Sequence, residues 1–180
     1  MPHDGSQGKE MKAILHCDRK WGIGRNNDLM FSLPADMKFF RETTRGKVVI
    51  MGSNTLISLP NEKPLKNRTN IVLWPGGDKS RALADGFIMA DDMDEFKAEV
   101  RKYPADDVYV IGGAMMYRTM LPYCSEALIT KVDADGGAEV FFENLDRAEG
   151  WRLAEQSEPV IDNGYAIRFC RYVNDGVKEL

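Results

Sequence analysis

The chain has 180 residues, of which 43% are hydrophobic and 29% charged, and its formal net charge is −4. This length suits one folded domain with a sizeable core, and the composition is that of a globular protein rather than a disordered chain. The acidic balance and the lack of a basic run exclude nucleic acid as an expected partner, and no apolar stretch is long enough to span a bilayer. We expect a polar tail over residues 1–10 and a single, monomeric domain over residues 11–180.

The three cysteines, Cys17, Cys124 and Cys170, are far apart in the sequence. No pair has the spacing of a metal site or of a redox motif. Reduced, partly buried thiols are typical of cytoplasmic proteins. The sequence therefore predicts a cytoplasmic location, no membrane association and no metal centre.

Short apolar strands alternate with helices over the first two thirds of the chain. The patterns predict strands at residues 13–17, 48–51, 70–73, 87–89 and 107–111, and helices at residues 34–44, from 53, from 92 and at 114–121. Ser32 is the expected cap of helix 34–44, and Gly46 is expected to close it. Ser53, Asn54 and Thr55 offer further cap residues, and Asp92 has capping-box spacing with Glu95.

The last third of the chain has strand patterns without helices between them, at residues 127–132, 140–142, 151–158 and 165–173. Strands that alternate with helices favour right-handed parallel crossovers, whereas consecutive strands favour antiparallel edge pairing. We therefore expect an α/β fold, a three-layer sandwich around one mixed, mostly parallel sheet of about eight strands.

Glycines mark two of the strand-to-helix junctions. Gly112-Gly113 follows the strand at 107–111, and Gly52 follows the strand at 48–51. Glycine lets the backbone come close to a ligand, and the N–H groups of a following helix suit a phosphate. Each junction alone fits an ordinary turn or N-cap equally well. Two junctions at one edge of a sheet match the crevice where open α/β sheets bind nucleotides.

Asp36 is a lone acid at a helix start, among the apolar residues Leu33, Met37 and Phe40. An acid in a first helical turn can simply complement the helix dipole. An apolar setting can instead desolvate the carboxylate, which is common at functional sites, and it would then match a ligand edge that donates hydrogen bonds. His16, in the first strand, is either a proton donor or a packed residue.

A series of short segments occurs in the order known from one enzyme family. They are Trp21-Gly22-Ile23-Gly24, residues 33–40, Val49-Ile50-Met51-Gly52, residues 67–73 and Val110-Ile111-Gly112-Gly113, followed by Tyr117, Leu121-Pro122, Thr130 and Phe141-Phe142. On these segments, the chain from residue 11 to about residue 173 resembles dihydrofolate reductase of the bacterial chromosomal type.

The resemblance implies NADPH-dependent reduction of 7,8-dihydrofolate to tetrahydrofolate, and binding of antifolate inhibitors. Asp36 would bind the 2-amino group and the adjacent ring nitrogen of the pterin and support protonation at N5, while the cofactor supplies hydride to C6. Thr130 would support Asp36. Leu29 and Phe31, in a loop over residues 22–31 that closes over the nicotinamide, complete the implied catalytic residues.

The resemblance also implies which residues bind the substrate and the cofactor. Ile14 and Ile111 would present carbonyls to the pterin, and Arg68 would pair with the glutamate carboxylate. The implied substrate-binding residues are Ile14, Leu15, Asp36, Met37, Phe40, Leu59, Leu65, Arg68, Ile111, Tyr117 and Thr130. The implied cofactor-binding residues are His16, Ile23, Gly24, Gly52, Ser53, Asn54, Thr55, Leu73, Trp74, Ile111, Gly112, Gly113, Ala114, Met115, Met116 and Tyr117, with a cis Gly112–Gly113 bond.

The chain departs from the family pattern at two places. Ser53, Trp74 and Met115 stand where members often carry side chains that bind the 2′-phosphate of NADPH. An aromatic side chain can stack on adenine but cannot pair with a phosphate dianion, so we expect a weakened NADPH preference with NADH use, or contacts rebuilt from Lys79 or Arg81.

The second departure is in the loop. Phe31 replaces a common tryptophan and lacks its N–H, and Glu139, where a shorter acid is common, is the expected loop partner. Altered loop closure or product release is expected.

Two other interpretations stay open. The reductase domain of riboflavin biosynthesis shares the fold and cofactor, but the segment over residues 34–40 favours folate. A non-catalytic pterin-binding or nucleotide-binding module is favoured by the missing 2′-phosphate contacts. The intact Asp36, Thr130, Arg68 and Gly112-Gly113 favour an enzyme.

Overall fold

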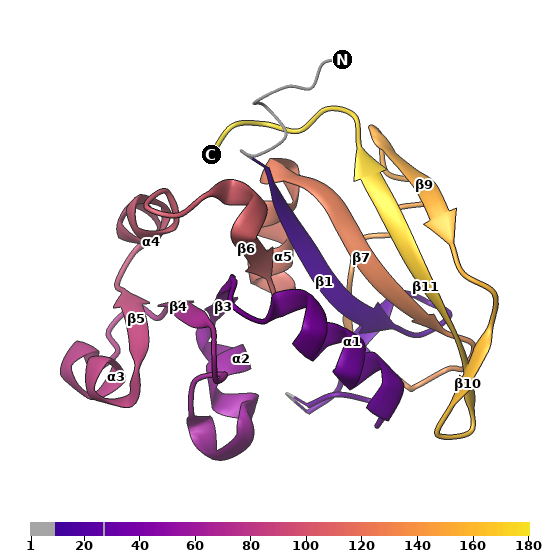
Figure 1. The fold of residues 1–180 in the computed structure, drawn as a ribbon, viewed down its shortest axis with the longest axis horizontal. Coiled ribbons are helices and arrows are strands. Elements are labelled where there is room, and N and C mark those ends of the chain that lie inside the picture. The colour runs from indigo at the N-terminus through magenta and orange to yellow at the C-terminus, as the bar shows by residue number, and fades with distance from the viewer. Residues whose placement is uncertain (1–9, 27) are drawn as a thin grey trace.

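The computed structural model describes residues 10–26 and 28–180. Within them, a nine-stranded sheet contains β1 (Met11–Cys17), β3 (Val48–Gly52), β4 (Thr69–Leu73), β5 (Phe87–Ala90), β6 (Val108–Val110), β7 (Cys124–Val132), β9 (Trp151–Gln156), β10 (Val160–Asp162) and β11 (Tyr165–Asn174). Eight of these follow the order β10-β11-β7-β1-β6-β3-β4-β5, and β9 pairs with β11 (Figure 1).

The pairing directions confirm the expected mixed, mostly parallel sheet. Strand β1 is parallel to both β6 and β7, and the pairs β3–β6, β3–β4 and β4–β5 are also parallel. The late strand β11 runs antiparallel to β7, and β9 and β10 run antiparallel to β11. The parallel part comes from the alternating half of the sequence, because a parallel connection needs a crossover.

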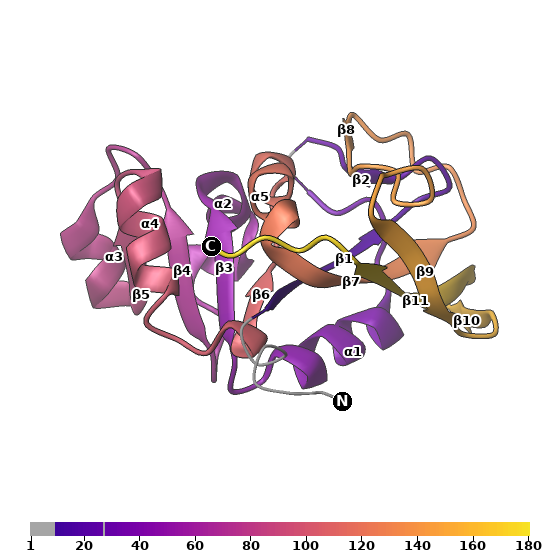
Figure 2. The same ribbon diagram turned by 90° about the horizontal axis from the view of Figure 1, so that it is seen from above.

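Helices cover both faces of the sheet. The α-helices are α1 (Pro34–Thr44), α2 (Ser53–Ser58), α3 (Lys79–Asp85), α4 (Met93–Val100) and α5 (Ala114–Met120), and the short 3-10 helices are η2 (Pro60–Glu62), η3 (Ala105–Asp107) and η4 (Leu121–Tyr123). Figure 2 shows α1 on one side of the sheet and α2 and α5 on the other. Three layers result, as the sequence predicts.

Several local predictions are wrong. Residues 140–142 do not join the main sheet, because β8 (Val140–Phe141) pairs with β2 (Gly22–Gly24) in a separate two-stranded sheet. Helix α3 and strand β10 were not anticipated. Ser53 to Thr55 are not caps, since Gly52 is the N-cap of α2 and no side chain caps it. The Asp92 cap is confirmed, because its carboxylate accepts a hydrogen bond from the Glu95 N–H at 2.8 Å.

The cysteines are free and buried, as expected. Burial raises the pKa of the Cys17 thiol to about 12, so this thiol stays protonated near neutral pH. Among the described residues, no group of three or more His, Cys, Asp or Glu side chains could hold a metal ion. No helix in the described part of the chain is long and apolar enough to cross a membrane.

Candidate active site

Asp36 lies buried in the first turn of α1. Its carboxylate contacts polar side chains from two strands. The Thr130 hydroxyl donates to Asp36 Oδ1 at 2.6 Å, and His16 Nδ1 lies 3.2 Å from Asp36 Oδ2. The register explains why these groups meet. His16 on β1 is paired with Thr130 on β7, and paired residues of parallel strands present their side chains to the same face. Helix α1 covers that face (Figure 2).

The N-terminus of α1 is capped from the far end of the sheet. Asp162 accepts hydrogen bonds from the Ala35 N–H at 3.0 and 3.1 Å and from the Asp36 N–H at 3.2 Å. The predicted Ser32 cap is wrong, since Leu33 is the N-cap residue and makes no side-chain bond. A carboxylate at this position binds otherwise unpaired N–H groups and complements the helix dipole, so Asp162 fixes the turn that carries Asp36.

The loop before α1 is anchored at both ends. Asp18 accepts hydrogen bonds from the N–H groups of Lys20, Gly22 and Gly136, which ties the loop base to the segment before β8. The Asn26 N–H donates to Glu139 Oε1 at 3.1 Å, so Glu139 is a partner of the loop, as predicted.

The two loop residues predicted as catalytic have different surroundings. Leu29 is 58% exposed. Phe31 is buried, and its ring centroid lies 4.9 Å from that of Tyr165 and 6.1 Å from that of His16. Phe31 therefore lies beside the group that includes Asp36, whereas Leu29 faces outward.

Tyr117 connects α5 to the first strand. Its hydroxyl donates to the Ile14 carbonyl at 2.9 Å. Burial raises the pKa of Tyr117 far above the ordinary value, so the hydroxyl is a neutral donor. The Ile14 carbonyl, which the resemblance assigns to the pterin edge, therefore already accepts one hydrogen bond from a side chain.

The two glycine junctions lie side by side. Strands β3 and β6 are neighbours, and the Gly52 N–H donates to the Gly112 carbonyl at 2.9 Å. The Gly112–Gly113 peptide bond is cis, as the family resemblance implies. Gly112 has φ +133, and a Cβ there would lie 2.8 Å from Thr55 Oγ1. The sequence prediction that both junctions share one edge of the sheet is confirmed.

Arg68 lies against α1 and carries an unpaired buried atom. Its guanidinium lies 5.8 Å from the centre of the Phe40 ring and donates to the Arg41 carbonyl, while Nε has no partner in the described structure. Burial, followed by the charges of Arg45 and Arg41, lowers the pKa of Arg68. Arg68 is therefore a positive charge close to two other arginines, and its Nε–H is free to donate. Such a group is suited to bind an anionic ligand.

Four apolar side chains that the resemblance assigns to the substrate are only partly covered. Met37 is exposed and Phe40 half-buried on α1. Leu59 and Leu65 are half-buried and pack against one core cluster, and Leu65 is held by two hydrogen bonds to the buried Asn70 side chain. These residues leave apolar surface available to a ligand.

The residues at the predicted 2′-phosphate position carry no cation. Trp74 is half-buried, and Met115 is 60% exposed. Lys79 Nζ lies 3.1 Å from Asp91 and 2.7 Å from Glu95, so two acids already share its charge. The Arg81 side chain is outside the described residues. Leu73 and Met116 are buried in the core, so only their backbones can face a ligand.

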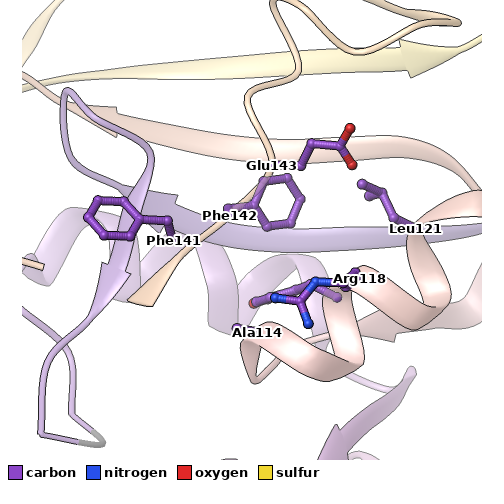
Figure 3. Close-up of a pocket in the computed structure, with 7 residues that line it drawn as sticks. Ala114, Arg118, Leu121, Phe141, Phe142 and Glu143 are labelled. Carbon is purple, nitrogen blue, oxygen red and sulfur yellow. The ribbon is translucent and has the colours of Figure 1, made fainter. Parts of the chain in front are cut away.

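A hollow of about 270 Å³ lies between α5 and the segment after β8, next to the glycine turn. Its lining consists of Ala114, Tyr117, Arg118, Leu121, Phe141, Phe142 and Glu143. In Figure 3, Arg118 projects from α5, while Phe142 and Glu143 lie on the opposite side of the hollow.

A buried carboxylate at a helix start, beside a glycine cradle at the carboxyl edge of parallel strands, defines an α/β enzyme that acts on a small molecule with a nucleotide cofactor. The comparisons identify the family. The family model described as dihydrofolate reductase matches residues 10–174. The chain therefore belongs to the dihydrofolate reductase family and is an oxidoreductase.

Individual relatives agree with the family model. The chain is 34% identical to the dihydrofolate reductase of Neisseria gonorrhoeae over 165 residues, which cover 91% of this chain and 98% of that protein. It is 34% identical to the Haemophilus influenzae enzyme over 82% of this chain and 88% of that protein. It is 30% identical to the Bacillus subtilis enzyme over 88% of this chain and 91% of that protein.

Proposed function

We propose that the chain catalyses the NADPH-dependent reduction of 7,8-dihydrofolate to 5,6,7,8-tetrahydrofolate, which supplies one-carbon metabolism. The observation that carries the proposal is the buried Asp36 carboxylate with the Thr130 hydroxyl at 2.6 Å. An ionised carboxylate only accepts hydrogen bonds, so its remaining lone pairs require donors. The 2-amino group and adjacent ring N–H of a pterin are two parallel donors of this kind.

Asp36 binds the pterin and supports protonation at N5 through water. The nicotinamide of the bound cofactor supplies the hydride that C6 accepts. Thr130 orients Asp36, Ile14 and Ile111 offer carbonyls to the pterin edge, and the loop with Leu29 and Phe31 excludes water when it closes. In each of these roles, the residues stabilise the transition state by holding the substrate in place or by their charge.

The remainder of dihydrofolate extends toward Arg68. The apolar side chains of Met37, Phe40, Leu59 and Leu65 flank the aminobenzoyl group. The unpaired Nε of Arg68 supports a bidentate pair with the glutamate α-carboxylate. Arg68→Lys keeps the charge but removes the planar fork, so the KM for dihydrofolate should rise by about tenfold or more.

Gly112-Gly113-Ala114 and the residues from Gly52 to Thr55 would hold the pyrophosphate of the cofactor. A weakened preference for NADPH over NADH is part of the proposal. It is supported by Ser53, Trp74 and Met115 and by the two acids that hold Lys79. A 2′-phosphate gains most from cationic partners.

The test is a steady-state assay with purified protein and dihydrofolate, run in parallel with NADPH and NADH. Dihydrofolate-dependent oxidation of either cofactor supports the reductase, and the ratio of the two kcat/KM values measures the preference. A preference for NADPH of many thousandfold would exclude the weakening. No turnover with either cofactor, together with tight antifolate binding, would favour a non-catalytic binding module.

The riboflavin-type reductase is tested in the same assay with a ribosylamino-pyrimidine substrate in place of dihydrofolate. Turnover of that substrate alone would overturn the assignment to folate. Arg68 provides a second discriminator, because only the folate substrate carries a glutamate carboxylate for it.

A further inference from the structure

The candidate site holds a second titratable group in contact with Asp36. His16 Nδ1 lies 3.2 Å from Asp36 Oδ2, and the two side chains are only 6% and 11% exposed. The other ring nitrogen, His16 Nε2, is buried and has no hydrogen-bond partner in the described part of the chain. A packed core histidine would have its buried polar atoms satisfied, so this geometry needs another account.

The surroundings of the pair contain few other charges. Thr130 on β7 is neutral and donates to Asp36 Oδ1, and the ring of Phe31 lies on one side of His16. Asp162 on β10 accepts from the Asp36 N–H, so a second carboxylate lies behind the helix turn. The neutral Tyr117 hydroxyl of α5 donates to the backbone of β1, and within the described residues no lysine or arginine forms an ion pair with Asp36.

The hydrogen bonds fix which nitrogen carries a proton. An ionised carboxylate only accepts, so Nδ1 must be protonated when Asp36 is ionised. Oδ1 then accepts from Thr130 and Oδ2 from His16, and the carboxylate plane is held by two donors on neighbouring strands.

We infer that His16 is a positioning residue for Asp36. Its Nδ1–H fixes the orientation of the carboxylate whose remaining lone pairs bind the ligand. The consequence for the reaction rests on the proposed function, whereas the pairing itself does not.

The pairing is tested by NMR of the imidazole nitrogens. The chain has two histidines, so the full-length His3→Gln variant leaves His16 as the single imidazole signal. The expected neutral form carries its proton on Nδ1. In the background of His3→Gln, Asp36→Leu should shift the proton of the neutral imidazole toward Nε2, because no acceptor then faces Nδ1.

A neutral form protonated on Nε2 in the protein with Asp36 intact would overturn the inference. This readout needs no turnover, so it separates failure of the pairing from failure of the proposed reaction. The tautomer is measured without any change at Asp36, so the test survives even where that variant folds poorly.

The effect on turnover is tested with two substitutions of different chemistry. His16→Asn keeps a donor near the position of Nδ1, whereas His16→Leu fills the space without a donor. We expect His16→Asn to lower kcat/KM less than His16→Leu does, because only the asparagine still supplies a donor to the carboxylate.

His16→Leu should lower kcat/KM by about tenfold, because one donor to the carboxylate is lost. A merely structural role would lower thermal stability in both variants and reduce kcat/KM by the same factor in each. Equal kcat/KM values for the two variants would overturn the positioning role.

Discussion

The two ends of the candidate site are built differently. At the substrate end, side chains from three elements are bonded around one carboxylate, with Thr130 and His16 on the strands and Asp36 on α1. At the cofactor end, the contacts are made by the backbone, with the Gly52 N–H on the Gly112 carbonyl. We therefore expect activity to fall when a single polar atom is removed at the substrate end. At the cofactor end, we expect cofactor binding to weaken when a side chain is added to a glycine.

The charge of the two ends differs in the same way. Buried acids and a buried histidine surround the substrate end, whereas the cation nearest the predicted 2′-phosphate position, Lys79, is held by Asp91 and Glu95. Specific charge recognition is therefore concentrated at the substrate end. The following predictions test this difference, from the largest expected effect to the smallest.

Asp36→Asn should lower kcat/KM for dihydrofolate by at least about a hundredfold near neutral pH, the usual range for loss of acid–base support. The amide keeps the size of the carboxylate, so the protein should still fold, as circular dichroism and thermal unfolding can verify. The KM for the cofactor should change little. Full retained activity would remove Asp36 from the mechanism.

Gly112→Ala should raise the cofactor KM by about tenfold or more. Its φ is +133, and the added Cβ would lie 2.8 Å from Thr55 Oγ1, so either the turn or α2 must move. Gly46→Ala is the matched control, because Gly46 also has positive φ, at +75, but nothing lies within 4 Å of an added Cβ. The control should lose about 1 kcal/mol of stability and keep its cofactor KM. Equal KM values for both variants would show that the close approach at Gly112 is unimportant.

Asp162→Ala should lower the free energy of unfolding by about 1 kcal/mol, the usual effect of removing a helix cap. Because the capped turn carries Asp36, kcat should also fall by about threefold to tenfold. Asp92→Ala removes a comparable cap from α4, away from Asp36, and should affect stability in urea unfolding without affecting kcat. If both variants reduce kcat equally, the cap of α1 has no special link to the site.

Phe31→Trp should change turnover by only about threefold. The ring lies in the buried contact with Tyr165, and tryptophan adds both volume and an N–H donor. We expect the steady-state rate to change more than the single-turnover hydride rate, since loop closure and product release are affected rather than chemistry. An unchanged turnover and pH profile would argue against a role of this position.

Much of the fold follows from local patterns. Helix α1 was predicted with its observed bounds, and the β-branched strand at 48–51 lies within β3. These predictions succeed because apolar periodicity and glycine breaks act over a few residues. Strand β10 was missed because it has three residues, too short for a periodic signal.

The limit of prediction from local sequence patterns is clearer at the candidate site. The sequence marked Asp36, Thr130 and both glycine junctions as functional candidates, and the structure brings Asp36 to Thr130 and Gly52 to Gly112. The resemblance placed His16 among the cofactor-binding residues, whereas its Nδ1 lies 3.2 Å from Asp36, and the sequence gave no sign of Asp162. Nothing near Asp162 distinguishes it from an acid in an ordinary turn before Asn163 and Gly164.

The sequence by itself determined the alternating strands and helices, the glycine turns and the acid at the start of α1, since each depends on neighbouring residues. Only the tertiary structure decided that Asp162 rather than Ser32 caps α1, across a separation of 127 residues for the Ala35 bond. It also decided that the His16 side chain meets Asp36. Both outcomes depend on strand order and register, which bring distant polar groups within bonding distance and which no local pattern specifies.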